Sequence, residues 1–170
     1  MFKLLQIFTV AFFIAVANSQ GPPGPEFFWD IWCTRNFVVE PATDSFPLWY
    51  DIIPDPIFNT FSPGEAIRVT LRPNLPDFEF TGFLIRAHTQ SDMSAVGQWI
   101  GIGDAQGMSC TNENFVGDDY ASQSVPNMRT FQDLIWTAPS TPGNYVFNLT
   151  TVETFMSYWV DQLSPVIRVV

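Results

Sequence analysis

Apolar and polar residues alternate along much of this chain with the two-residue period that is typical of β-strands. Within residues 65–72, Ile67, Val69 and Leu71 alternate with polar residues, which predicts a strand with one face in a core. The same alternation predicts strands over residues 78–89 and 144–152. Shorter strands are expected at 96–102, 130–138, 156–163 and, as a last edge strand, 165–170.

Glycine and proline turns separate these strands at intervals of roughly ten residues, and no helical period appears between them. The polar stretch 104–129 is expected to be mostly loop. Residues 27–61 are rich in large apolar side chains but interrupted by prolines, so extended segments and turns are expected there. The pattern predicts an all-β fold, an antiparallel β-sandwich of one domain.

The N-terminal residues do not show this alternation of apolar and polar positions. Lys3 precedes an apolar run over residues 4–16, and small residues follow at 15–19, which is the order of a secretory signal peptide. We expect cleavage after Ser19, with Ala17 as the alternative. The chain is then divided into a signal peptide at 1–19, a Pro/Gly-rich leader at 20–26 and the sandwich domain at 27–170.

The charge balance narrows the possible partners. The chain has 17 acidic residues against 7 Lys and Arg, a formal net charge of −10. Nucleic acids and anionic membrane surfaces are bound by clustered basic residues, so neither is expected as a partner. No second apolar span follows the signal, so we expect a secreted, extracellular protein without a transmembrane segment.

Two cysteines remain after the signal, Cys33 and Cys110. In an oxidising compartment a pair of cysteines favours a disulfide, with two free thiols as the alternative. The bridge closes a loop of about 77 residues, for which chain-entropy models give roughly 4 kcal/mol.

Residues for catalysis or metal binding are not evident. The only histidine, His88, alternates with Arg86 along a strand, which favours a surface or rim position, and no nucleophile motif accompanies it. Asp118 and Asp119 are typical of a solvated loop. Together with Asn112 and Asn114 they form an oxygen-rich stretch without the spacing of a known calcium loop. We expect no enzyme activity, no catalytic residue and no metal site.

Asn148-Leu149-Thr150 is an N-glycosylation sequon. The strand period places Asn148 opposite Tyr145, Phe147 and Leu149, which predicts an outward position that permits glycosylation. An unused sequon is the alternative.

Aromatic residues make up 16% of the chain, more than a generic sandwich requires. Filling of the core is the first interpretation. The alternative is a surface for an apolar ligand or for oligomer contacts in the N-terminal region. The candidate residues for that surface are Trp29, Trp32, Trp49, Tyr50 and Phe58.

Several short motifs, in order, resemble the signature of the reeler domain family. They are Phe80-Thr81-Gly82-Phe83-Leu84-Ile85-Arg86-Ala87, Val96-Gly97-Gln98-Trp99, Ser109-Cys110, Trp136-Thr137-Ala138-Pro139, Gly143-Asn144-Tyr145-Val146-Phe147 and Tyr158-Trp159. The resemblance covers roughly residues 60–170, and more weakly 27–59 around Cys33 and Pro41. Many reeler domains carry a Pro-x-His after the first cysteine and a Thr-His after the second, and this chain has neither.

The resemblance implies an immunoglobulin-like β-sandwich in which Cys33 is bonded to Cys110. It also suggests a secreted binding protein for extracellular recognition or innate defence, with a microbial surface component as a partner. The alternative is a carrier of an apolar small molecule (a carotenoid, lipid or sterol) held by the aromatic N-terminal region. No cofactor is expected beyond such a bound carotenoid or lipid.

Overall fold

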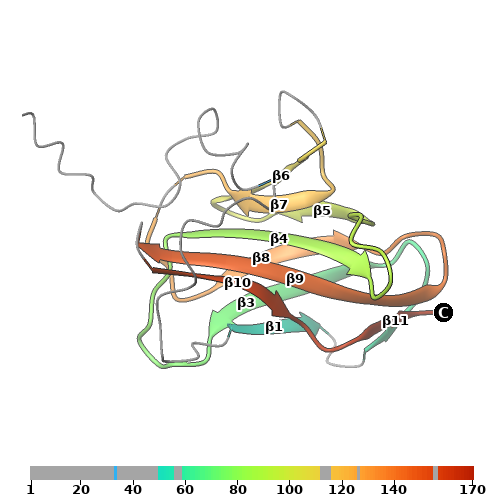
Figure 1. Cartoon of the computed structure of the whole chain (residues 1–170), viewed down its shortest axis with the longest axis horizontal. Helices are drawn as coiled ribbons and strands as arrows, with labels where there is room; N and C mark the ends of the chain where they lie inside the picture. The colour runs from blue at the N-terminus through green and yellow to red at the C-terminus, as the bar shows by residue number, and fades with distance from the viewer. Residues whose placement is uncertain (1–32, 34–49, 56–58, 112–115, 126, 155–156) are drawn as a thin grey trace, which may run out of the picture.

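Two β-sheets face each other in a computed structural model of the chain, which describes residues 33, 50–55, 59–111, 116–125, 127–154 and 157–170 (Figure 1). The sheets contain four and seven strands. The fold is all-β and sandwich-like, as the alternating pattern predicts.

The four-stranded sheet has the order β1-β3-β8-β5 and is antiparallel throughout. Its central strands alternate between the core and the outer face, so that Ile67, Val69 and Leu71 are buried while Arg68 and Arg72 are exposed. The bounds of its strands are β1 Tyr50–Asp55, β3 Ala66–Pro73, β8 Gln132–Thr137 and β5 Gln98–Gly101.

The seven-stranded sheet has the order β2-β11-β9-β4-β7-β6, with β10 paired to β9 beside this path. Its pairs are antiparallel except that β2 and β11 run parallel. The bounds are β2 Thr60–Phe61, β4 Gly82–Thr89, β6 Ala105–Met108, β7 Tyr120–Gln123, β9 Gly143–Thr154, β10 Ser157–Leu163 and β11 Ile167–Val169.

Aromatic side chains from both sheets fill the space between them. Trp99 on β5 and Trp136 on β8 are buried, and their rings lie 5.1 and 5.0 Å from that of Phe147 on β9. Tyr145 adds a ring 6.1 Å from Trp136 and donates a hydrogen bond to the Thr141 carbonyl at 2.7 Å. A tyrosine that bonds back to the preceding turn is a known feature of immunoglobulin-like sandwiches. These four aromatic side chains are therefore part of the core between the sheets.

The stretch expected to be mostly loop, residues 104–129, also contains two short strands, β6 and β7, which the sequence pattern did not predict. The sequence shows no apolar alternation over β7, because β7 buries polar side chains against β4. Ser122 donates to the Phe83 carbonyl at 2.6 Å, and the Phe83 amide donates to the Gln123 side chain at 2.8 Å. These bonds satisfy buried polar groups without an apolar pattern.

The final strand also differs from its prediction. β11 is not an edge strand, because Arg168 pairs with Asn144 on one side and with Thr60 on the other. The pairing partner β2 has only two residues, and a strand that short gives no periodic signal in the sequence.

Candidate functional site

A pocket of about 370 Å³ opens at one end of the four-stranded sheet, and it is here called the β3 pocket. The pocket is open to solvent and is not an enclosed cavity. Five apolar and four polar residues share its lining. They are Pro73, Leu75, Pro76, Phe78 and Phe131, with Thr70, Arg72, Asp77 and Thr130.

Strand β3 and the loop after it build one wall. The alternation of β3 turns Thr70 and Arg72 away from the core. The chain then turns at Asp77, whose φ of 61° lies in the left-handed region that aspartate tolerates better than most residues. Phe78 follows, and its ring packs edge-on against Trp159 of β10 at 5.7 Å. This contact fixes the loop against the other sheet.

The opposite wall consists of Thr130 and Phe131, directly before β8. Two backbone hydrogen bonds between Phe80 and Arg129, of 2.9 and 3.0 Å, hold this segment. The Arg129 guanidinium also lies about 6 Å from the Phe80 ring and donates to the Val125 carbonyl at 2.9 Å. Burial lowers the pKa of Arg129 below its ordinary value, and the nearby charge of Asp104 opposes that change.

Two charged residues line the pocket, Arg72 and Asp77, and Arg72 is paired. Arg72 donates to Asp51 of the neighbouring strand β1 at 3.2 Å, in register with it. Both side chains stay about half exposed, at 57% and 47%. The pair therefore presents N–H donors and carboxylate oxygens side by side to solvent, without a net charge.

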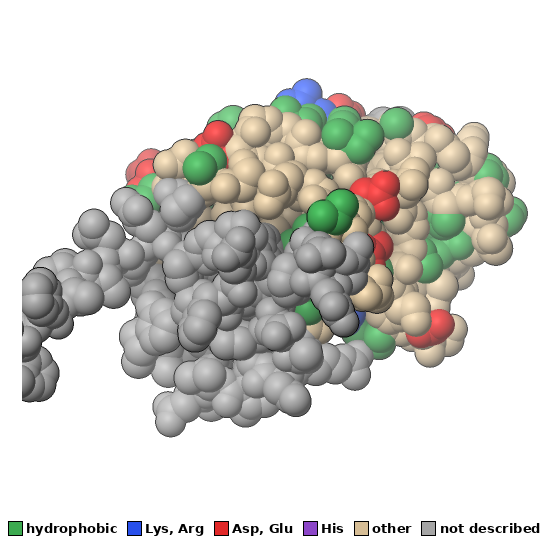
Figure 2. Space-filling view, turned by 90° about the horizontal axis from the view of Figure 1, so that it is seen from above, with side chains coloured by type: hydrophobic (Ala, Val, Ile, Leu, Met, Phe, Trp, Pro, Cys, Tyr) green, Lys and Arg blue, Asp and Glu red, His purple; other side chains and the backbone are tan. Residues whose placement is uncertain are grey.

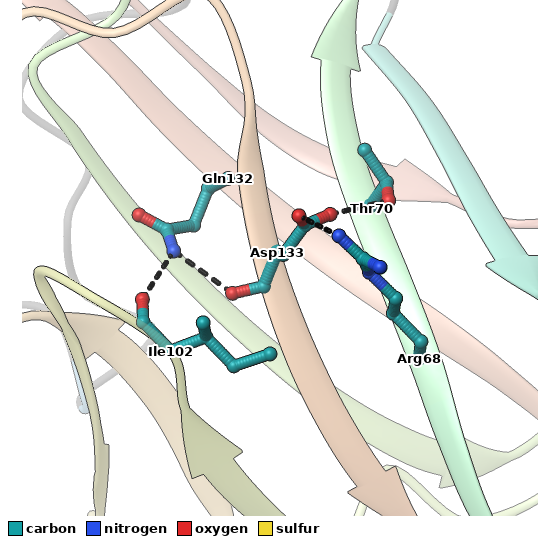
Figure 3. A network of polar contacts seen from close by, with 5 residues as sticks. All are labelled: Arg68, Thr70, Ile102, Gln132 and Asp133. Atoms are coloured by element: carbon teal, nitrogen blue, oxygen red, sulfur yellow. Dashed lines mark hydrogen bonds and ion pairs between the residues drawn. The ribbon is translucent and has the colours of Figure 1, made fainter.

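A second polar network continues along the same face of the sheet (Figure 3). Arg68 and Thr70 of β3 both point toward the Asp133 carboxylate on β8 and donate hydrogen bonds to it, with a distance of 2.6 Å for Thr70. Gln132 donates to the backbone carbonyls of Ile102 and Asp133 at 2.9 and 2.8 Å. These bonds tie β3, β8 and the end of β5 together beside the pocket.

The hydrogen bonds of this network lower the pKa of the Asp133 carboxylate. The hydrogen bond from Arg68 holds the pKa of Asp133 below its ordinary value of 3.8. The Thr70 hydroxyl lowers it further, and partial burial acts in the opposite direction. The pKa of Arg68 is raised by the same bond with Asp133.

A pH dependence of stability follows from Asp133. Because its folded-state pKa is lower than its unfolded value, its contribution is present above about pH 4 and is lost as the pH falls through the folded pKa. We expect Asp133→Asn to show a smaller acid-induced decrease in urea midpoint than the wild type. Urea unfolding in steps from pH 7 to pH 2 measures this, and identical pH profiles for the two proteins would contradict it.

The polar side chains that line the pocket are those of Thr70, Arg72, Asp77 and Thr130, with no serine, cysteine, histidine or lysine among them. Within the described part of the chain, no group of three or more His, Cys, Asp or Glu residues is placed to hold a metal ion. Exposed apolar side chains do surround the pocket, with Phe131 57% and Leu75 51% exposed.

The two cysteines predicted to pair lie together on the outer side of the seven-stranded sheet. Cys33 and Cys110 form a disulfide with their Cα atoms 5.0 Å apart. Both pack against a small apolar cluster of Leu84, Met108 and Tyr120. The disulfide is thus part of a second, smaller core outside the sandwich.

His88 and Asn148 were expected on the surface, and the structure places both in buried positions, with 3% and 7% exposure. His88 lies with Nδ1 2.6 Å from the Thr89 carbonyl, and no partner is within reach of Nε2 among the described residues. Asn148 does point away from Phe147 and the core, but it donates to Asp161 at 3.0 Å. Strand periodicity identifies the side of a sheet, and it does not tell whether that side is covered. Glycosylation of Asn148 stays a prediction.

The aromatic candidates for an N-terminal surface are placed differently. Trp29, Trp32, Trp49 and Phe58 lie outside the described residues. Tyr50 begins β1, and its side chain is also outside the description. Of the oxygen-rich loop, Asp118 and Asp119 are described, whereas Asn112 and Asn114 are not.

The residues of the β3 pocket were not identified from the sequence. They come from 70–78 and 130–131, two segments that are far apart along the chain and adjacent in space. One feature of the sequence points to this pocket. Phe131 is a large apolar residue immediately before β8, and the alternation of β8 places it on the side that faces solvent.

Comparison with protein-family models identifies residues 33–170 as a reeler domain. The chain is similar to Ferric-chelate reductase 1 of Bos taurus, with 35% identity over 111 residues, or 64% of this chain and 18% of that protein. It is also similar to a protein named Putative defense protein 3 of Antheraea mylitta, with 33% identity over 103 residues, or 60% of each chain. The chain thus spans less than two thirds of these relatives' length.

Among solved structures, the human F-spondin reeler domain superposes with a TM-score of 0.59. The match covers 71% of this chain and 88% of that one at 19% identity, so it shows the fold alone. No helix of the described chain is both long and apolar enough to cross a membrane.

Proposed function

Because the chain belongs to the reeler domain family, we propose that it is an extracellular, non-enzymatic recognition protein that acts in defence by binding a microbial surface component. The relatives that are named defence proteins support this proposal more strongly than the reductases do. Two matched proteins of Antheraea mylitta are named defence proteins, and the chain covers 60% and 64% of their length. The match to Ferric-chelate reductase 1 covers 18% of that protein, so its named activity gives no basis for a reductase here.

The β3 pocket is the observation that carries the proposal. Its lining includes an exposed aromatic ring, Phe131, and Arg72, which pairs with Asp51 of the neighbouring strand just outside the pocket. Recognition sites commonly join an apolar contact to a few fixed polar groups. Strands β1 and β3 and the segment directly before β8 position these groups before any partner binds, which reduces the entropy lost on binding.

Binding to killed bacteria and to fungal cell walls tests the proposal. The full chain is incubated with each, and the bound fraction is compared with that of an acidic control protein of similar net charge. The proposal predicts binding above the control to at least one preparation. Binding no higher than the control with every preparation would contradict it.

A carrier of an apolar small molecule is the second candidate, and the apolar half of the same pocket favours it. Pro73, Leu75 and Phe131 offer a contact surface for a ring or a short hydrocarbon segment. The protein is purified from its native tissue, and its absorption spectrum and the mass of any organic extract are recorded. A stoichiometric polyene or lipid supports the carrier, whereas a colourless protein with no extract argues against it.

A further inference from the structure

We propose that the component bound by the β3 pocket is an uncharged glycan, with a sugar ring packed on Phe131 and its hydroxyl groups bonded to the Arg72–Asp51 pair. This inference rests on the proposed function and specifies the chemical class of its partner. The residues that carry it are Phe131, Arg72, Asp51, Thr70 and Thr130.

The polar groups of the pocket match hydroxyl groups. A sugar hydroxyl both donates and accepts a hydrogen bond, so it requires an acceptor and a donor close together. Arg72 and Asp51 supply both, 3.2 Å apart and about half exposed. Thr70 and Thr130 add hydroxyls on the two sides of the pocket.

The apolar residues of the pocket match the faces of a sugar ring. The faces of a pyranose ring present C–H groups, which the negative face of an aromatic ring attracts. Phe131 is 57% exposed and lines the pocket, and Leu75, 51% exposed, continues the apolar surface. A sugar ring seated here contacts apolar atoms with its face while its edge reaches the ion pair.

Charge disfavours a polyanionic partner. The chain has a formal net charge of −10, and the described side chains on the face shown in Figure 2 include acidic groups at several separate places. The arginines beside the pocket are already engaged, Arg72 with Asp51 and Arg68 with Asp133. A polyanion such as teichoic acid gains little from paired arginines and is repelled at longer range.

The polar half of the pocket also disfavours a long acyl chain. Filling the pocket with hydrocarbon removes water from Asp77 and Thr130 and from the N–H groups of Arg72 that do not face Asp51, without replacing those hydrogen bonds. Polar groups buried without partners oppose binding. An uncharged, hydroxyl-rich molecule satisfies both halves of the lining.

The test uses the full chain and four defined probes. They are a β-1,3-glucan oligosaccharide, an oligomer of N-acetylglucosamine, lipoteichoic acid and lipopolysaccharide. Binding is measured by calorimetry at low and at high salt. We expect binding of at least one uncharged oligosaccharide, with an affinity that salt leaves unchanged because no ion pair forms.

Variants then locate the site. Phe131→Ala and, separately, Arg72→Ala are each expected to weaken binding about tenfold or more, a difference of the size that one lost contact produces. Leu163→Ala is the matched control, because Leu163 is also an exposed apolar residue, 59% exposed, but lies on β10 of the other sheet. Its affinity is expected to equal that of the wild type.

The outcomes separate the two proposals. Binding to microbes that neither oligosaccharide competes with, or binding of the anionic polymers alone, would overturn the glycan and leave the recognition function standing. Oligosaccharide binding that neither Phe131→Ala nor Arg72→Ala weakens would overturn the pocket as its site. Absence of binding to any microbe and to any probe would overturn both proposals.

Discussion

Replacing both Cys33 and Cys110 by alanine is expected to lower the free energy of unfolding by about 4 kcal/mol. The bond joins residues 77 positions apart, so its removal restores many conformations to the unfolded chain. Both cysteines also pack against Leu84, Met108 and Tyr120, so the loss of two sulfur atoms from this cluster adds to the effect. Urea unfolding of the oxidised protein and the double variant measures the difference.

The reduced wild-type protein separates these two contributions. It retains both sulfur side chains in the small cluster and lacks only the covalent link. We expect most of the loss to appear already on reduction. A double variant within about 1 kcal/mol of the oxidised protein would contradict the account, since native disulfides typically contribute about 2–5 kcal/mol.

Gly97→Ala is expected to destabilise the domain by about 2–4 kcal/mol, the sum of a left-handed backbone penalty and local overpacking. Gly97 has a φ of 74°, and a Cβ atom added there would overlap Nε1 of Trp136 and lie 2.6 Å from the Thr137 carbonyl oxygen. The indole cannot move away easily, because Trp136 is buried and donates to the Val96 carbonyl at 3.2 Å. Thermal and urea unfolding measure the loss.

Gly64→Ala is the matched control for that prediction. Gly64 has nearly the same φ, 76°, and no atom lies within 4 Å of the position of its Cβ. It therefore carries the backbone penalty alone, about 1–2 kcal/mol. Equal losses in Gly97→Ala and Gly64→Ala would show that the contact with Trp136 is unimportant.

The Gly97 contact also gives a physical reason for two of the family motifs. Val96-Gly97-Gln98-Trp99 and Trp136-Thr137-Ala138-Pro139 are 40 residues apart along the chain, and β5 and β8 are paired so that Trp99 lies opposite Trp136. The glycine leaves space for the indole, and the valine carbonyl accepts its N–H. The motifs describe one packing arrangement that involves both strands.

The sequence predicts strands that have one apolar face, such as β3. It does not predict strands that bury polar side chains, such as β7. β3 alternates clearly because Ile67, Val69 and Leu71 face a core while their neighbours face solvent. β7 gives no such signal, because Ser122 and Gln123 are buried through hydrogen bonds to the backbone of β4.

The site was harder to predict than the fold. A strand period assigned His88 and Asn148 to the outer side of the seven-stranded sheet, and it carried no information that this side is covered. The β3 pocket depends on contacts between residues 70–78 and 130–131, which the pairing of β3 with β8 brings together. Only the tertiary structure shows that Phe131 lies beside Arg72.

Hydrogen-exchange mass spectrometry with a bound glycan tests the central claim, recognition at the β3 pocket, most directly. Amide exchange of the full chain is compared with and without a soluble β-1,3-glucan or N-acetylglucosamine oligosaccharide. The account predicts slower exchange in residues 74–78 and 130–131, with little change in β10 at Ser157–Leu163. Protection confined to segments away from the pocket, or no protection by any oligosaccharide that binds, would contradict it.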